Sequence, residues 1–293
     1  MNATNITEAV SQPSGLLHSF KLKRILLAHD ASRAAGQALV DATTLAHRFG
    51  SELLLAHVQS PEETPLNGLA QSRHEKRYAE AELEEIKDRL INAGLGCRAI
   101  VRIGAVGDTL VNLCVEEGVD LVMLGAYGFG SQDRHTLGST TEHLLSALPC
   151  PAMVYGPSAK FPLVADEHGR PVLFAVSFPL SSSQSEKAIQ IARYFDVPIE
   201  VLHVTDTVSP VALHRIEEEC RQIASVLKAG GVKSTWSVLS GQPAKVIVKH
   251  STRFACPFIL MPIRSRHIMA ADRVAAHVIR ESDIPVLTYS AGP

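Results

Sequence analysis

The sequence is poor in aromatic side chains and lacks any long uninterrupted run of apolar residues. Phe, Trp and Tyr make up 5% of the 293 residues, although 46% of the residues are hydrophobic. The apolar content is therefore mainly aliphatic, which favours helices packed on a β-sheet over a β-sandwich. No apolar run approaches the roughly 18 residues of a membrane-spanning helix, so we expect no membrane partner.

Disulfide, metal and nucleic-acid signals are also missing. The five cysteines are odd in number, widely spaced and without a C-x-x-C motif, which favours buried, reduced thiols. Thirteen histidines show no H-E-x-x-H or paired spacing, so we expect no metal held by protein ligands. A formal net charge of −2 gives no reason to expect nucleic acid. The first residues do not resemble a signal peptide, and we expect a cytoplasmic protein.

Short apolar runs alternate with amphipathic segments from Lys23 onward. Such runs, bounded by Gly, Pro or Asp, predict buried strands, and the segments between them have helical spacing. The strands expected in the first half are Arg24–His29, Glu52–Val58, Cys97–Ile103, Asp120–Leu124 and Ala152–Tyr155. This order predicts an α/β fold with a mainly parallel sheet and helices on both faces.

The same order returns in the second half of the chain. The matching segments are Val172–Val176, Ile199–Val204, Val238–Gly241, Phe258–Met261 and Ile284–Tyr289. His57 and His203 fall at equivalent strand positions, which indicates a structural role for both. Duplication of one unit explains the repeat. We expect a flexible tail over residues 1–20, a first domain over 21–156, a linker over 157–169 and a second domain over 170–293.

A glycine-rich loop follows the fourth strand, with Gly125, Gly128 and Gly138 before Ser139. Glycines let backbone N–H groups approach phosphate oxygens, and the start of the next helix offers unpaired N–H groups and a positive dipole end. Asp30, after the first strand, faces the same crevice, where a carboxylate accepts hydrogen bonds from ribose hydroxyls. Asp30 also suits the N-cap of the first helix. A tight loop without a ligand is the simpler alternative.

The spacing G-x-x-G-x9-G-S at these positions resembles the ATP-binding signature of the universal stress protein (UspA-like) family. Asp30, the Leu-Ala-His-Val run at 55–58 and the Pro-Cys-Pro run at 149–151 resemble that family too. The resemblance is strong over residues 23–155 and weak over 170–290. It implies two tandem Rossmann-like domains of the adenine nucleotide alpha hydrolase-like type, each with a five-stranded, mainly parallel sheet, and a sensing role in stress response.

The resemblance further implies that the first domain binds ATP with Mg²⁺. The residues it assigns to the nucleotide are Ala28, Asp30, Val58, Leu124, Gly125, Gly128, Arg134, Gly138, Ser139, Thr140 and Thr141. The first three border the adenosine, the next three approach the ribose and phosphates, Arg134 meets a phosphate, and the last four cradle the phosphate chain. The loop departs from the family pattern at Phe129, where an arginine is common, and at residues 135–137.

The second half departs further at the positions equivalent to the loop. The residues there are Ser177 for Asp30, Pro262 for Gly125 and Asp272 for Gly138. Proline has no N–H to donate, and an acidic residue repels phosphate. We therefore expect a degenerate, structural second domain, although Arg264, Arg266 and Arg273 leave weak anion binding open.

Family members commonly dimerise through the last strand of the domain. The resemblance thus implies an intramolecular pseudo-dimer of the two domains, leaves a homodimer open, and implies an unidentified regulatory protein partner. No motif places a general base or nucleophile, so we name no catalytic residue and expect at most slow ATP hydrolysis. A scaffold without nucleotide and a nucleotidyl or phosphoryl transferase remain the alternatives. The loop at 29–33 lacks the S-G-G-x-D-S and H-x-G-H motifs of such transferases.

Overall fold

The computed structural model describes residues 21–60, 69–127, 137–159, 169–207, 209–263 and 272–290. Strands and helices alternate in what we define as the first repeat, from β1 to β5. Its elements are β1 (Arg24–Ala28), α1 (Arg33–Phe49), β2 (Glu52–Gln59), α2 (Leu69–Asn92), β3 (Cys97–Ile103), α3 (Val106–Glu116), β4 (Leu121–Gly125), α4 (Ser139–Ala147) and β5 (Ala152–Tyr155). Every strand predicted for this half is present, with ends that differ by at most one residue.

The second repeat follows the same order. Its elements are β6 (Val172–Ala175), α5 (Ser182–Phe195), β7 (Ile199–Thr205), α6 (Pro210–Ala229), β8 (Ser234–Ser240), α7 (Pro243–Arg253), β9 (Ile259–Ile263), α8 (Asp272–Glu281) and β10 (Val286–Ser290). The predicted start of β8 at Val238 was wrong, because the polar residues at its beginning carry no apolar strand signal. The predicted duplication is therefore visible as two successive α/β units.

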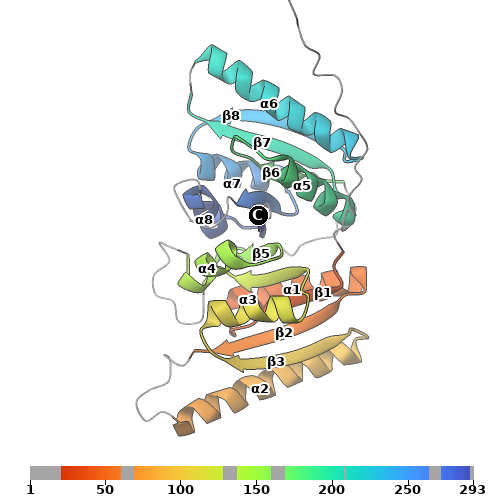
Figure 1. Cartoon of the computed structure of the whole chain (residues 1–293), viewed down its shortest axis with the longest axis vertical. Coiled ribbons are helices and arrows are strands. Elements are labelled where there is room, and N and C mark those ends of the chain that lie inside the picture. Colours follow the sequence, from red (N-terminus) through yellow and green to blue (C-terminus); the bar gives the residue numbers. More distant parts are fainter. Residues whose placement is uncertain are drawn as a thin grey trace, which may run out of the picture.

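The described strands form one ten-stranded sheet in the order β3-β2-β1-β4-β5-β10-β9-β6-β7-β8. Neighbours within each repeat are parallel, whereas β5 and β10 pair antiparallel, with Val154 opposite Val286 and Ala152 opposite Thr288. Helices α2 and α6 consequently lie at opposite ends of the molecule (Figure 1). The last strands of the two repeats thus meet inside one chain, which is the arrangement expected of an intramolecular pseudo-dimer.

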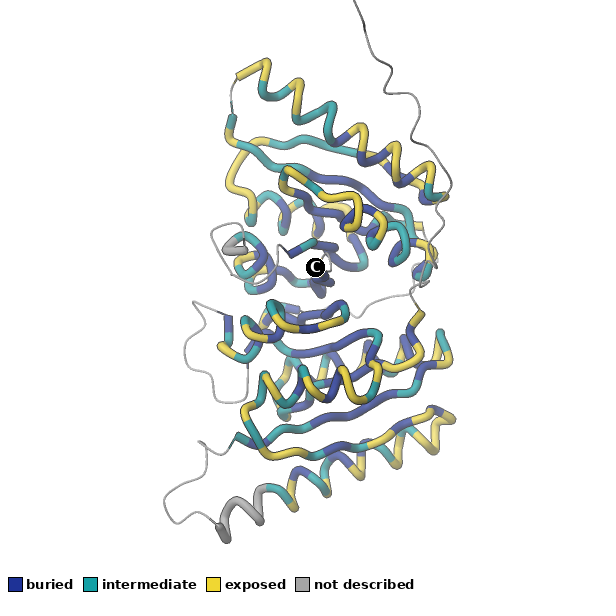
Figure 2. The backbone as a smooth tube through the Cα atoms, in the orientation of Figure 1, coloured by how far each residue is buried: buried dark blue, intermediate teal, exposed yellow. Residues whose placement is uncertain are grey.

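Two apolar layers cover the two faces of the sheet. Successive residues of a strand point to opposite faces, so Ile25 and Leu27 enter one layer and Leu26 enters the other. The first layer is formed with α1, α2, α5 and α6, and the second with α3, α4, α7 and α8. Buried residues accordingly follow the strands, and exposed residues follow the outer sides of the helices (Figure 2). Burial on both faces explains the near-continuous apolar strands.

Two tyrosines at equivalent positions fasten helices to the central strands. The hydroxyl of Tyr155 on β5 donates to Oδ2 of Asp41 on α1 at 2.8 Å, and both side chains are fully buried. The hydroxyl of Tyr289 on β10 donates to the carbonyl oxygen of Gln184 on α5, also at 2.8 Å. Burial raises the pKa of both phenols well above its ordinary value, so both remain hydrogen-bond donors.

We expect Tyr155→Phe to destabilise the protein more than Tyr289→Phe. The first change removes a donor from a buried carboxylate, which costs about 1–3 kcal/mol, whereas the second removes a bond to a neutral carbonyl, which costs about 0.5–1.5 kcal/mol. Urea unfolding of the three proteins measures the difference. Equal midpoints for the two variants would contradict a special role for the Asp41 contact.

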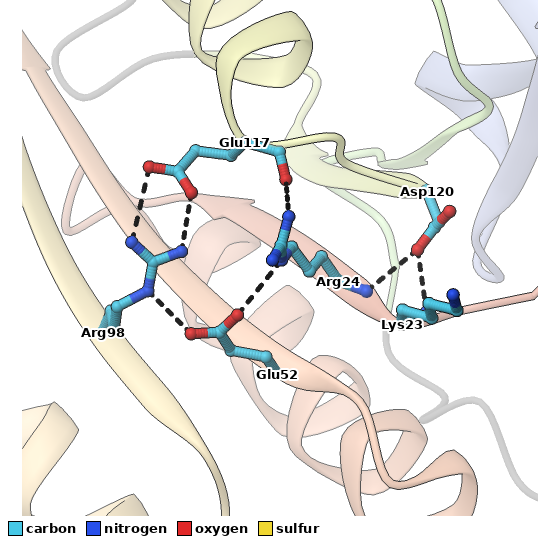
Figure 3. Close-up of polar contacts among 6 residues, drawn as sticks. All are labelled: Lys23, Arg24, Glu52, Arg98, Glu117 and Asp120. Carbon is cyan, nitrogen blue, oxygen red and sulfur yellow. Dashed lines mark hydrogen bonds and ion pairs between the residues drawn. The ribbon is translucent and has the colours of Figure 1, made fainter.

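A network of charged groups joins the amino ends of the first three strands to the end of α3 (Figure 3). Arg98 contacts Glu52 and Glu117 at 2.6 Å each, and Arg24 reaches Glu52 at 3.2 Å. Arg24 Nη1 also donates to the carbonyl oxygen of Glu117 at 2.5 Å. Asp120 accepts hydrogen bonds from the backbone N–H groups of residues 23 and 24. These side chains are partly exposed, so the network contributes only modestly to stability. Its main effect is to position the amino ends of the three strands relative to the end of α3.

Glu117→Gln should reduce the dependence of stability on acidic pH. The hydrogen bond from Arg98 lowers the pKa of the Glu117 carboxyl group in the folded chain. Its stabilising contribution is therefore complete above the pKa of the unfolded chain and is lost as the pH falls through the lower, folded value. The difference in unfolding midpoint between wild type and variant should shrink as the pH falls from the pKa of Glu117 in the unfolded chain to its lower pKa in the folded chain. Glu116→Gln, at an exposed neighbouring position, is the matched control and should leave the profile unchanged.

All five cysteines are free, and four of them are buried, as predicted for reduced thiols. Burial raises the pKa of Cys97 to about 11 and that of Cys220 and Cys256 to about 12, which keeps these thiols protonated near neutral pH.

None of the helices that the structure describes is long and apolar enough to cross a membrane.

Candidate functional site

The strand order reverses between β1 and β4 and leaves a crevice at the carboxyl ends of these strands. The chain passes from β1 to β2 on one side and from β4 to β5 on the other, so the connections diverge. Ligands of open parallel sheets bind at such a point. A pocket with a volume of about 680 Å³ opens here. This volume lies within the roughly 300–1,000 Å³ that is typical of small-molecule sites.

Nine of the eleven residues that the sequence assigned to a ligand line this pocket. They are Ala28, Asp30, Val58, Leu124, Gly125, Gly138, Ser139, Thr140 and Thr141. The other two, Gly128 and Arg134, lie outside the described residues. The structure therefore brings together residues more than 100 positions apart, while their contact with a ligand stays a prediction.

The turn after β1 holds Asp30 at the pocket. Oδ1 of Asp30 accepts a hydrogen bond from the backbone N–H of Ser32 at 3.0 Å, and Ala31 has a φ of 58°. Oγ of Ser32 accepts from the N–H of Ala35 at 3.1 Å, so Ser32 is the N-cap of α1. The prediction that Asp30 caps this helix was wrong, because the chain turns for two further residues before the helix begins. Asp30 is the one carboxylate among the described residues of the lining.

Gly125 allows the end of β4 to approach the first turn of α1. A Cβ atom at this position would lie 3.0 Å from Cβ of Ala34 and 3.5 Å from Oγ of Ser32. The first distance is shorter than ordinary carbon contacts of roughly 3.5–4.0 Å. A larger residue at position 125 would therefore require α1 or β4 to shift by a few tenths of an ångström.

The start of α4 forms the opposite wall. Gly138 is its N-cap and, having no side chain, makes no side-chain cap hydrogen bond to the first turn. The first N–H groups of a helix have no partner within the helix, and they concentrate positive potential at its start. Oγ1 of Thr141 donates to the carbonyl oxygen of Ala126 at 3.1 Å, so its proton is used by the backbone. Ser139 and Thr140 are left as the hydroxyl donors of this wall.

An apolar wall completes the pocket, and most of its residues were not predicted from the sequence. Besides Val58, it contains Ala56, Val106, Leu110 and Leu144. Ala56 precedes Val58 by two residues on the same face of β2, so strand alternation identifies it once Val58 is assigned. The three residues from α3 and α4 could not be assigned, because only the folded chain brings those helices over the end of β2.

His29 and His57 border the apolar wall, and His57 has an equivalent, His203, in the second repeat. His57 donates from Nδ1 to the carbonyl oxygen of His29 at 2.9 Å, and His203 makes the same contact to Val176 at 3.0 Å in the second repeat. These bonds confirm the predicted structural role at equivalent positions, although His57 also lines the pocket. Burial lowers the pKa of His29, so this side chain is neutral at pH 7.

The equivalent crevice of the second repeat is much smaller, with a volume of about 130 Å³. Strand register places Leu202 where the first repeat has Ala56, because each lies opposite the alanine that ends β6 or β1. Pro262 stands opposite Tyr289, as Gly125 stands opposite Tyr155. Larger side chains have therefore filled most of the space.

The fold and the crevice define two Rossmann-like α/β domains with a ligand-sized pocket in the first. A family model described as "Universal stress protein family" matches residues 21–156 and again residues 169–290. The chain therefore belongs to the universal stress protein family, in a form with two tandem domains.

Individual relatives agree with this assignment. A universal stress protein of Synechocystis sp. is 25% identical over 303 aligned residues, which cover 92% of this chain and all of that protein. One of Thermus aquaticus is 26% identical over 133 residues, covering 45% of this chain and 97% of its own length. The crystal structure of a universal stress protein from Archaeoglobus fulgidus has a TM-score of 0.74 at 20% identity, over 93% of this chain and 98% of that one.

The contact between Gly125 and Ala34 can be tested by a double-mutant cycle. Gly125→Ala should destabilise the protein by about 1–3 kcal/mol because it overpacks the contact between β4 and α1. Ala34→Gly should recover part of this loss in the double variant, although glycine in a helix costs up to about 1 kcal/mol by itself. Thermal or urea unfolding of the four proteins gives the coupling. If the changes in the free energy of unfolding are additive, the side chains at positions 125 and 34 are not in steric contact.

Proposed function

We propose that the first domain, residues 21–156, binds ATP, and that the bound nucleotide regulates a response to stress. The observation that carries this proposal is the 680 Å³ pocket with two unlike walls. One wall is the start of α4, where the N-cap Gly138 makes no side-chain cap hydrogen bond, and the other is apolar. A triphosphate requires N–H donors and positive potential, and a purine requires an apolar slot.

The walls give each part of the nucleotide a place. The base would lie against Ala56 and Val58, where carbon atoms from β2 and α3 line the pocket. The ribose hydroxyls would donate to Asp30, whose carboxylate is oriented by the N–H of Ser32. The phosphates would extend toward Gly138 and the hydroxyl groups of Ser139 and Thr140, with Gly128 and Arg134 as further predicted contacts. Because the described groups among these line one pocket, a single ligand can reach all of them.

Magnesium would accompany the phosphates. The part of the chain that the structure describes holds no cluster of three His, Cys, Asp or Glu side chains suited to a metal ion. Mg²⁺ commonly keeps several waters and binds through substrate phosphates with one or two protein oxygens, so this lining fits an ion that arrives with the nucleotide. Among the described residues of the lining, the hydroxyl groups of Ser139 and Thr140 on the phosphate side and the carboxylate of Asp30 are the oxygens that could complete its coordination.

The second domain, residues 170–293, is structural and degenerate toward nucleotide in this proposal. Pro262 offers no N–H where Gly125 would, and Ser177 replaces the carboxylate of Asp30. We further propose that the protein acts in the cytoplasm as a sensor with a regulatory protein partner and with slow ATP hydrolysis at most. A homodimer is compatible with this role.

ATP binding is tested by calorimetry and by mass spectrometry of nucleotide released from the purified protein. We expect adenine nucleotide in a ratio of one per chain. Gly138→Asp should weaken ATP binding about 100-fold, because it places a negative charge at the start of α4. Asp30→Asn should weaken it about 10-fold through loss of a charged hydrogen bond.

Asp206→Asn is the matched control, because Asp206 follows β7 in the second repeat, is exposed and lines neither pocket. It should leave ATP affinity unchanged. Circular dichroism must show that each variant is folded. An affinity that is indifferent to both Gly138→Asp and Asp30→Asn in folded protein would refute the proposed site.

A further inference from the structure

The small pocket of the second repeat has a chemistry of its own. Its volume of about 130 Å³ is bordered by the ends of β6, β7 and β9 and by the first turns of α7 and α8, and it opens to solvent at the exposed residues Ser177 and Pro243. Leu202 is 1% exposed, and Ala175, Ile247 and Met261 are each less than 8% exposed. An apolar cavity of about 150 Å³ can bind a benzene-sized ring, so this pocket has the size for one aromatic ring.

Substitution has removed the groups that would attract phosphate. When Tyr155 of β5 and Tyr289 of β10 are matched, the positions of Thr140 and Thr141 correspond to Val274 and Ala275, both of which line this pocket. Hydroxyl groups have therefore been replaced by hydrocarbon. Neither Lys nor Arg is among the described residues of the lining. None of these described residues carries a charge to replace the hydration that a charged ligand would lose. The side chains of Arg264, Arg266 and Arg273, which left anion binding open, lie outside the described residues.

Two polar side chains, Ser177 and His203, are among the described residues of the wall, and His203 is the less exposed of the two. His203 donates from Nδ1 to the carbonyl oxygen of Val176 at 3.0 Å, and the ring of Phe178 stacks on it with centroids 4.8 Å apart. Burial lowers the pKa of His203, so the ring is neutral at pH 7. A neutral imidazole that donates from Nδ1 has an acceptor at Nε2. The wall therefore suits a ligand that carries a single hydrogen-bond donor.

We propose that the pocket formed by Ala175, Leu202, His203, Val204, Ile247 and Met261 binds an uncharged aromatic or heteroaromatic compound that carries one N–H or O–H donor. The site is separate from the ATP site proposed for the first domain and does not depend on it. Domain duplication has thus produced two pockets of different selectivity, one for a large anion and one for a small neutral ring.

Phenol is the probe, and phenyl phosphate is its charged counterpart. Titration is followed by the ¹³C methyl signal of Met261, assigned with Met261→Leu, while the signal of the fully buried core residue Met153 serves as reference. Phenol should shift the Met261 signal in a saturable manner with a Kd on the order of 1 mM, as expected for a ligand of so few atoms. Phenyl phosphate should bind at least 10-fold more weakly.

Two matched variants show which pocket binds phenol and which binds ATP. Val204→Phe fills the second pocket and should weaken phenol binding at least 10-fold without affecting ATP. Val58→Phe makes the equivalent change in the first pocket and should abolish ATP binding while phenol still shifts Met261. Failure of ATP binding and failure of phenol binding are thereby distinguished.

Three results would overturn the proposal. One is an unmoved Met261 signal at about 10 mM phenol, and another is equal affinity for phenol and phenyl phosphate. The third is phenol binding that is lost in Val58→Phe rather than in Val204→Phe. Should Val204→Phe prove unfolded, the shift of Met261 relative to Met153 in the wild-type protein, with and without phenol, decides the question.

Discussion

The carboxyl ends of parallel strands cannot all be covered where the connections on two neighbouring strands leave in opposite directions. In this protein that constraint acts twice, between β1 and β4 and between β6 and β9. Each time it leaves a hollow bordered by strand ends and helix starts. What each hollow can hold is then decided by side-chain volume and by the N–H groups that remain accessible. Gly125 lines the first hollow, and the larger Leu202 and Pro262 line the second, which is much smaller.

The antiparallel pairing of β5 with β10 determines how the two hollows are placed. It makes one sheet of two repeats, and apolar residues from both repeats belong to the same layer on each face. A glycine permits the junction: a Cβ atom at Gly156, directly after β5, would lie 2.0 Å from the carbonyl oxygen of Ile279 on α8. The backbone of one repeat therefore packs directly on the other. Such contact favours a rigid relation between the two pockets.

The second repeat also has polar groups where the first repeat has apolar core residues. Oε1 of Glu200 on β7 accepts from Oγ of Ser237 at 2.7 Å and contacts Nε2 of His250 at 3.0 Å. Strand register and helix position match these three residues to the buried residues Leu54, Ile100 and Leu113 of the first repeat. Because one carboxylate satisfies both partners, the change is tolerated in the interior. The two repeats have thus diverged in their cores as well as in their crevices.

The sequence by itself determined the order of strands and helices, the duplication and the glycine-rich segment, because each leaves a local pattern of apolar spacing or glycine. The resemblance to universal stress proteins assigned nine residues that the fold brings to one pocket, and the glycines, Asp30 and the hydroxyl residues among them also follow from strand ends and helix starts, which are local features. The roles of Ser32 and Thr141 needed the tertiary structure, because hydrogen bonds chose among several hydroxyl groups. The apolar wall from α3 and α4 and the small pocket of the second repeat were likewise decided by packing. They depend on which helix covers which strand end, and no local pattern encodes that contact.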